Sequence, residues 1–184
     1  MKRVFIIHGW EADPESNWFP WLANELEKKG IAAVVPAMPN SAHPLCSEWV
    51  AYLKKIVGRV DEDTFFVGHS LGPIAILRFL QSLPANEKAG GVIMVAGFSE
   101  SLGIPETESF FERPLNYEKI KESANKFEVI SSDNDPYVPI AKEEILRDKL
   151  GAELTILHDH GHLNAGNGFF ELPIVLEKIL VMAK

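Results

Sequence analysis

Short apolar segments alternate along this chain with longer segments in which apolar residues recur at helical spacing. The short segments are rich in β-branched and aromatic residues, and most are followed by glycine, proline or a polar turn, which is typical of β-strands. We expect strands over residues 4–9, 31–36, 64–70, 90–97, 125–132 and 153–159. We expect helices over residues 17–30, 44–60, 73–83, 140–151 and 169–183, the last with Pro173 near its start.

The strand segments are apolar at nearly every position rather than at every second one. This pattern is typical of a parallel sheet that helices cover on both faces. The chain has 184 residues, which is enough for one domain with a sizeable core. We therefore predict an α/β fold, a three-layer α/β/α sandwich around a mostly parallel sheet of about six strands. Residues 1–184 are expected to form this single domain.

Residues 97–124 interrupt the alternation with a polar, proline-containing segment that includes Phe110 and Phe111. A loop of this length inside a compact domain often has a functional role. The segment either borders a substrate pocket or is a plain crossover with a short helix near residues 116–123. The sequence leaves both interpretations open.

The strand segment 64–70 runs into Gly-His-Ser-Leu-Gly, where Ser70 stands between two glycines and a helical pattern follows at once. A Gly-x-Ser-x-Gly sequence alone occurs by chance in roughly one chain in twenty of this size. The strand before it and the helix after it are the context that a nucleophile elbow requires. Such a turn holds the hydroxyl clear of the sheet, beside the backbone N–H of Leu71 and the positive end of the helix.

A serine nucleophile needs a general base, and the chain supplies acidic and basic candidates downstream. SSDNDPYVP, residues 131–139, follows one strand segment, and HDHGHLNAG, residues 158–166, follows another. The order serine, aspartate, histidine is that of α/β-hydrolases. Because ligands bind at the carboxyl ends of strands in open α/β sheets, all three groups are expected at one edge of the sheet.

Two aspartates could orient the histidine. The candidates are Asp133 and Asp135, two residues apart, and we expect only one of them to face the imidazole. Pro136 pushes Asp135 towards an extended conformation just past the strand. Asp133 is expected instead to cap the turn by accepting a backbone N–H within SSDND. These considerations favour Asp135.

The motifs resemble those of α/β-hydrolases, and more narrowly those of compact serine hydrolases similar to retinoblastoma-binding protein nine. The resemblance covers nearly the whole chain, through HGW at 8–10, GHSLG at 68–72, DPYVP at 135–139 and Gly161-His162. It implies a short parallel sheet without a large cap domain, and it implies no particular substrate.

The same resemblance implies site residues. It implies a catalytic triad of Ser70, Asp135 and His162, with the backbone N–H groups of Trp10 and Leu71 as the oxyanion hole. From the roles of these residues we expect an esterase-like serine hydrolase that cleaves an ester, thioester or amide of a small molecule or peptide through an acyl-enzyme, without a cofactor.

Other functions remain as alternatives. A protein-binding module could keep the hydrolase fold and a reactive serine yet act through its surface, since a fold does not settle a function. A nucleotide-binding protein is disfavoured, because the turn HGWEADPES lacks a glycine-rich phosphate loop. The alternating His158, His160 and His162 could hold zinc, but a carboxylate-rich ligand set is missing and we expect no metal site.

Charge and composition limit the possible binding partners and the expected cellular compartment. The formal net charge of −8 offers no basic surface for nucleic acid. The chain has one cysteine, so no intrachain disulfide can form, and a reducing compartment is expected. The apolar run near the N-terminus is too short for a signal peptide, and no stretch could span a membrane. We expect a cytoplasmic protein, with a protein partner and the oligomeric state left open.

Overall fold

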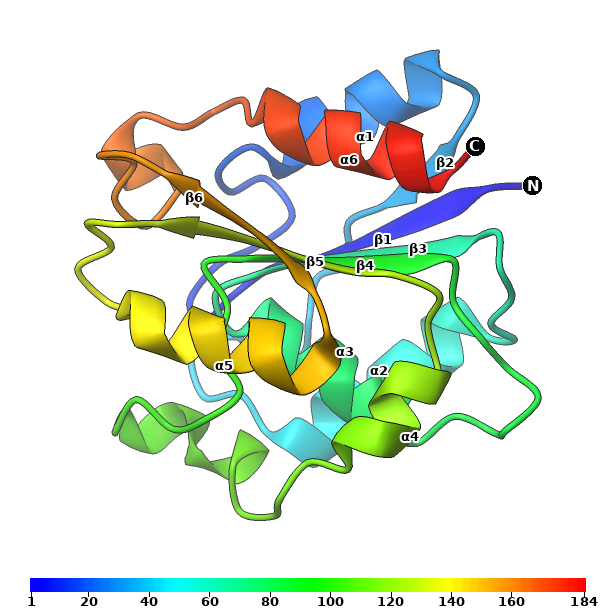
Figure 1. Cartoon of the computed structure of the whole chain (residues 1–184), viewed down its shortest axis with the longest axis horizontal. Helices are drawn as coiled ribbons and strands as arrows, with labels where there is room; N and C mark the ends of the chain where they lie inside the picture. Colours follow the sequence, from blue (N-terminus) through cyan, green and yellow to red (C-terminus); the bar gives the residue numbers. More distant parts are fainter.

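A computed structural model describes all 184 residues, and its six strands form one sheet (Figure 1). The strands lie in the order β2-β1-β3-β4-β5-β6, and every neighbouring pair is parallel. Their bounds are β1 Arg3–Ile7, β2 Ala32–Val34, β3 Thr64–His69, β4 Gly91–Val95, β5 Phe127–Ser132 and β6 Glu153–Leu157. The predicted fold class is confirmed, and the sheet is parallel throughout.

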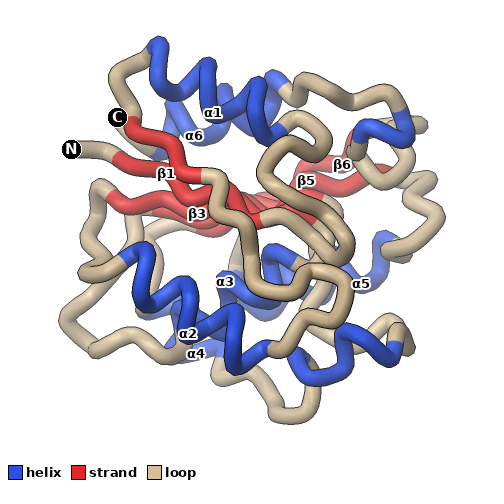
Figure 2. Tube along the Cα trace, turned by 180° about the vertical axis from the view of Figure 1, so that it is seen from behind, coloured by secondary structure: helices blue, strands red, loops and turns tan.

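Helices cover both faces of this sheet. Figures 1 and 2 show α1 and α6 together on one face, and α2, α3, α4 and α5 on the other. The α-helices are α1 Phe19–Lys28, α2 Cys46–Val57, α3 Gly72–Leu80, α4 Tyr117–Glu122, α5 Ile140–Leu150 and α6 Pro173–Met182. Two short 3₁₀ helices, η1 Pro105–Phe110 and η2 Ala165–Asn167, lie in loops.

The alternation of side chains along each strand explains why the strands are apolar at almost every residue. In β1, Val4 and Ile6 pack with the α1 and α6 layer, whereas Phe5 and Ile7 belong to the core on the opposite face. Successive strand residues point to opposite faces, so a sheet covered on both sides needs apolar residues at both sets of positions.

The two edge strands depart from this pattern. Val34 in β2 and Ile156 in β6 remain exposed, although a sheet covered on both faces was expected to bury its apolar residues. An edge strand has a neighbour on one side only, and the helices do not extend over it fully. The sequence pattern therefore predicted these strands but not their exposure.

Two helical segments differ from the expectation. The last helix begins at Pro173 and not at residue 169, since proline fits the first turn of a helix and disfavours helical backbone in the residue before it. Within residues 97–124, the short helix expected near residues 116–123 is α4, whereas η1 was not expected. No helix in the structure is both long enough and apolar enough to cross a membrane.

The order of the strands creates the place for a site. After β1 the chain passes outwards to β2, then returns to the other side of β1 to form β3. The loops that leave β1 and β3 therefore diverge at the carboxyl edge of the sheet. In open α/β sheets such a switch point is where ligands bind.

Candidate active site

The turn between β3 and α3 holds Ser70 in a strained backbone conformation. Ser70 has a φ of +58°, in the left-handed region that residues other than glycine rarely adopt. A side chain at Gly72 would collide with the carbonyl oxygen of Ile7, and one at Gly68 would lie 2.6 Å from the backbone nitrogen of Pro73. Only glycine allows this close approach of strand and helix. The tight packing in turn holds the backbone of Ser70 in its strained conformation.

The loop after β1 packs directly against this turn. A Cβ atom at Gly9 would lie 3.0 Å from the Cβ of Ser70. Next to it, the buried His8 donates from Nδ1 to the Gly9 carbonyl at 2.8 Å and accepts at Nε2 from the Met38 N–H at 3.0 Å. Burial lowers the pKa of His8, so the imidazole stays neutral and keeps both bonds.

Backbone N–H groups without an acceptor in the protein lie on both sides of this junction. Among them are those of Trp10, in the loop after β1, and of Leu71, which follows Ser70. N–H groups left free beside a serine can bind an anion or a polarised oxygen. These are the two residues that the resemblance implied for an oxyanion hole.

Asp135 and His162 form a buried pair. Asp135 Oδ2 lies 2.7 Å from His162 Nδ1, and both side chains are almost wholly enclosed. The other carboxylate oxygen, Oδ1, accepts the backbone N–H groups of Tyr137 at 2.8 Å and Val138 at 3.0 Å. Because all three neighbours donate to it, the Asp135 carboxylate is fixed with its charge towards the imidazole.

The loop that follows β6 has little backbone pairing of its own, and side chains from the end of β5 and the loop after it hold it. Ser132 Oγ accepts the N–H of His160 at 2.9 Å, and Asn134 Oδ1 accepts the N–H of Gly161 at 2.7 Å. These polar residues, which the sequence reasoning did not single out, align the two loops that carry Asp135 and His162. Their position directly after a buried strand was the available signal.

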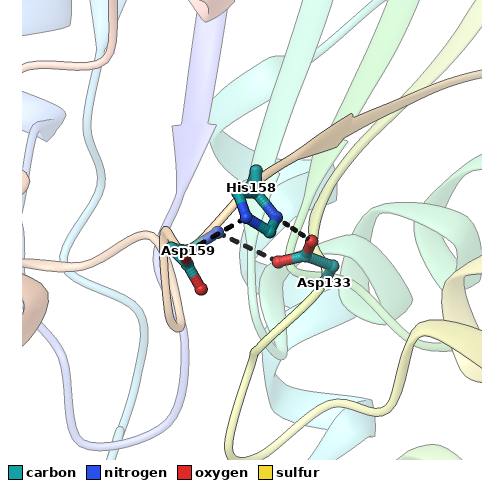
Figure 3. Close-up of side chains that lie close together, drawn as sticks. All are labelled: Asp133, His158 and Asp159. Atoms are coloured by element: carbon teal, nitrogen blue, oxygen red, sulfur yellow. Dashed lines mark hydrogen bonds and ion pairs between the residues drawn. The ribbon is translucent and has the colours of Figure 1, made fainter.

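Asp133 serves the same pair of loops rather than its own turn. Its Oδ1 accepts the backbone N–H of Asp159 at 3.0 Å, and its Oδ2 bonds His158 Nδ1 (Figure 3). The expectation that Asp133 caps a turn within SSDND was therefore wrong, since its N–H partner lies in the facing loop. Hydrogen bonds to the carboxylate, chiefly from the Asp159 N–H, lower the pKa of Asp133, and Asp133 raises that of His158.

The three alternating histidines do not share a ligand set. His158 is 83% exposed and lies between the carboxylates of Asp133 and Asp159, a group whose ligand atoms fall within 4.8 Å of one another (Figure 3). His160 stacks on Phe169 with ring centroids 4.8 Å apart. Each histidine thus has separate partners, and ion pairing accounts for the exposed group.

Ser70 and His162 line one pocket of about 340 Å³ at the carboxyl edge of the sheet. Segment 97–124 borders this pocket through Phe98, Leu102 and Ile104, and it also contains the short helix α4, so features of both interpretations are present. The buried Arg78 of α3 ties this segment to the elbow helix, because its guanidinium donates to three carbonyls there, among them that of Phe110 at 2.9 Å. The later part of the segment is thereby fixed to the helix that begins at the elbow.

A buried carboxyl group lies beside this arrangement. Glu143, in the first turn of α5, is fully buried, and neither of its carboxyl oxygens makes a hydrogen bond of normal geometry, although Ser131 and the Gly97 N–H are nearby. Burial raises the pKa of Glu143 to about 8, and the charge of Asp135 acts in the same direction. Glu143 is therefore a neutral acid at neutral pH, which no sequence pattern indicated.

The architecture and the serine elbow define an α/β-hydrolase, and the comparisons with known proteins agree. A family model described as "Serine hydrolase" matches residues 4–180. The YdeN gene product of Bacillus subtilis is 37% identical over 177 residues, covering 96% of this chain and 93% of that protein. The chain belongs to the serine hydrolase family and is a hydrolase.

A second relative and two solved structures add to this comparison. Serine hydrolase RBBP9 of Rattus norvegicus is 28% identical over 169 residues, covering 90% of this chain and 88% of its own. The crystal structure of the B. subtilis ydeN gene product superposes with a TM-score of 0.95 over 99% of this chain and 98% of that one, at 36% identity. Est1E from Butyrivibrio proteoclasticus, solved with ferulic acid, has a TM-score of 0.74 over 97% of this chain and 86% of its own. At 13% identity, Est1E shows the fold alone.

The neutral state of Glu143 predicts a pH-dependent stability. In the unfolded chain its carboxyl group ionises near pH 4.5, whereas in the folded protein it keeps its proton to about pH 8. Between these values the unfolded state binds fewer protons, so rising pH lowers the free energy of unfolding, by up to about 1.4 kcal/mol per pH unit. Glu143→Gln cannot ionise, and its stability relative to wild type should rise between pH 5 and pH 8.

Thermal or urea unfolding of both proteins at several pH values measures this difference. Glu144→Gln is the matched control, because Glu144 lies next in the same helix but is partly exposed and paired with Arg147. It should shift stability by a similar amount at every pH. A constant offset between Glu143→Gln and wild type would show that Glu143 is not a buried neutral acid.

Proposed function

We propose that the chain hydrolyses carboxylic esters through an acyl-enzyme on Ser70, with Asp135 and His162 completing a catalytic triad. One observation carries the proposal: a serine in the left-handed elbow conformation shares a pocket with a histidine whose far nitrogen is bound to a buried carboxylate. Thioesters and amides offer the same reacting carbonyl and belong to the proposed substrate class. The reaction needs no cofactor.

The bond from His162 Nδ1 to Asp135 decides the role of the imidazole. Because a carboxylate can only accept, Nδ1 carries the hydrogen and Nε2 is free to take a proton. Ser70 and His162 line the same pocket, and in the proposed mechanism Ser70 Oγ comes within hydrogen-bond reach of Nε2 when the substrate binds. As Ser70 attacks the carbonyl carbon, His162 accepts its proton, and Asp135 stabilises the imidazolium that forms.

The free N–H groups of Trp10 and Leu71 hold the negative oxygen of the tetrahedral intermediate. His162 then gives its proton to the leaving group, and the acyl group remains on Ser70. Water, deprotonated by the same imidazole, attacks the acyl-enzyme and releases the acid. Each removed N–H donor typically costs a factor of about 100 to 1,000 in kcat for such reactions, so both amides carry part of the rate.

The pocket wall indicates which acyl groups fit. Phe98, Leu102 and Ile104 give an apolar surface on segment 97–124, and the volume of about 340 Å³ is small. Ligand pockets commonly span about 300 to 1,000 Å³, so this one is at the lower end. We infer a preference for esters of short acyl chains.

A fluorophosphonate probe tests the nucleophile. We expect it to label wild-type protein stoichiometrically, because the probe reacts with an activated serine, and we expect Ser70→Ala to remove all labelling. Intact-protein mass spectrometry measures both. Labelling that persists in Ser70→Ala would show that another residue is the nucleophile. A wild-type protein that never reacts with the probe would favour a binding module on a hydrolase fold.

The two aspartates should differ sharply in their effect on turnover. Asp135→Asn favours the wrong imidazole tautomer and should lower kcat by up to roughly 10,000-fold. Asp133→Asn loses only a loop contact and the exposed His158 pair, and we expect its kcat to fall far less. Steady-state kinetics with p-nitrophenyl acetate, with circular dichroism as a folding check, compares them. The triad assignment is wrong if Asp133→Asn is the crippled enzyme.

A graded series of p-nitrophenyl esters measures the acyl preference. Short acyl groups should show a higher kcat/KM than chains of about twelve carbons, because the small pocket cannot enclose a long chain. Ile104→Ala removes bulk from the apolar wall and so enlarges the pocket, and it should move the preferred acyl length towards longer chains. A wild-type optimum at about twelve carbons or more, as for a deep lipid-binding pocket, would contradict the proposed substrate class.

A further inference from the structure

The main chain around His162 is held by buried side chains from distant parts of the sequence. The carbonyl oxygen of His162 accepts a hydrogen bond from His69 Nε2 at 2.9 Å. The next carbonyl, that of Leu163, accepts one from Trp18 Nε1 at 2.8 Å. Two consecutive carbonyls are thus held in place. The donor to the first comes from β3, and the donor to the second comes from the turn before α1.

This segment would not keep its shape unaided. It lies in neither a helix nor a strand, and Leu163 has a φ of +53°, in the left-handed region. A bulky residue in that conformation costs about 1–2 kcal/mol, so neighbouring contacts must hold it. Both carbonyls lie in a buried layer, where losing a hydrogen-bond partner is costly.

His69 is placed to link the two catalytic loops. It directly precedes Ser70, is buried, and its ring lies 4.9 Å from the ring of His162. A carbonyl oxygen only accepts, so His69 Nε2 carries the hydrogen. Burial lowers the pKa of His69 to about 3, so this imidazole stays neutral during turnover and cannot serve as the base.

Trp18 supports the adjoining peptide group through its bond to the Leu163 carbonyl. It is fully buried, and its ring meets the His69 ring edge-on with centroids 5.9 Å apart. The neighbouring Asn17 accepts the N–H of Ala165 at 2.9 Å, so the turn before α1 binds the histidine loop twice.

We propose that His69 and Trp18 are positioning residues for the reaction: their hydrogen bonds to the carbonyls of residues 162 and 163 fix the backbone that aims His162 at Ser70. This inference rests on the proposed function, since positioning matters only if His162 acts on Ser70. His69 makes the nucleophile and the base parts of one rigid unit. In reactions of this kind a misplacement of about 1 Å can cost about 100-fold in rate.

Substitutions at His69 separate its hydrogen bond from its packing. His69→Phe keeps an aromatic ring and removes the donor, and we expect kcat for p-nitrophenyl acetate to fall about 10- to 100-fold with KM within about twofold. His69→Gln places an amide N–H near the position of Nε2 and should restore kcat to within about fivefold of wild type. Trp18→Phe, which removes the second donor, should lower kcat in the same direction.

Phe19→Leu is the matched control. Phe19 is fully buried and its ring contacts those of both Trp18 and His69, but it makes no bond to the loop. It should lower the melting temperature and leave kcat of the folded enzyme unchanged. A loss of kcat in Phe19→Leu equal to that in His69→Phe would overturn the proposal, because packing would then explain both.

Hydrogen exchange of the amides of residues 160–165 tests the positioning without turnover. Exchange should accelerate about tenfold or more in His69→Phe, stay slow in Phe19→Leu and be largely restored in His69→Gln. If wild type neither cleaves esters nor reacts with fluorophosphonate, the proposed function fails, while the exchange data still show whether His69 holds the loop. Unchanged exchange together with unchanged kcat in His69→Phe overturns the positioning role. Should that variant not fold, Trp18→Phe decides by the same two measurements.

Discussion

The close approach of α3 to the end of β1 is the constraint on which the site depends. A side chain at Gly72 would meet the Ile7 carbonyl, so only glycine lets the helix begin so near the sheet. This approach holds Ser70 in the left-handed conformation and brings the loop of Trp10 beside it. The same helix carries Arg78, which binds the later part of the segment that borders the pocket. Ser70, the Trp10 loop and this segment thus depend on the position of one helix.

The second part of the site is built from polar side chains instead of backbone pairing. The loops after β5 and β6 contain few main-chain bonds to each other, and Ser132, Asp133 and Asn134 bind successive N–H groups of the facing loop. A loop held in this way can carry a strained residue such as Leu163 without losing its order. The arrangement places the Asp135 and His162 side chains together with little freedom to move.

Much of the fold could be predicted because its signals are local. The apolar runs marked all six strands, and glycines around Ser70 marked the elbow. Signals that depend on neighbours were missed: the exposure of the edge strands, the 3₁₀ helix η1, and the buried Glu143. A glutamate in a charge-rich helix such as α5 gives no sign of burial, because its environment is set by strands distant in sequence.

The sequence by itself determined where strands and helices alternate along the chain, where the elbow lies, and that the acidic and basic candidates follow strands. Each of these follows from the period of apolar residues or from the steric freedom of glycine, which act over a few residues. Only the tertiary structure decided which partner each candidate meets: Asp133 faces His158 and the Asp159 N–H, and Asp135 faces His162. Hydrogen bonds between loops depend on the register of β5 against β6 and on side-chain direction, and no local pattern encodes either.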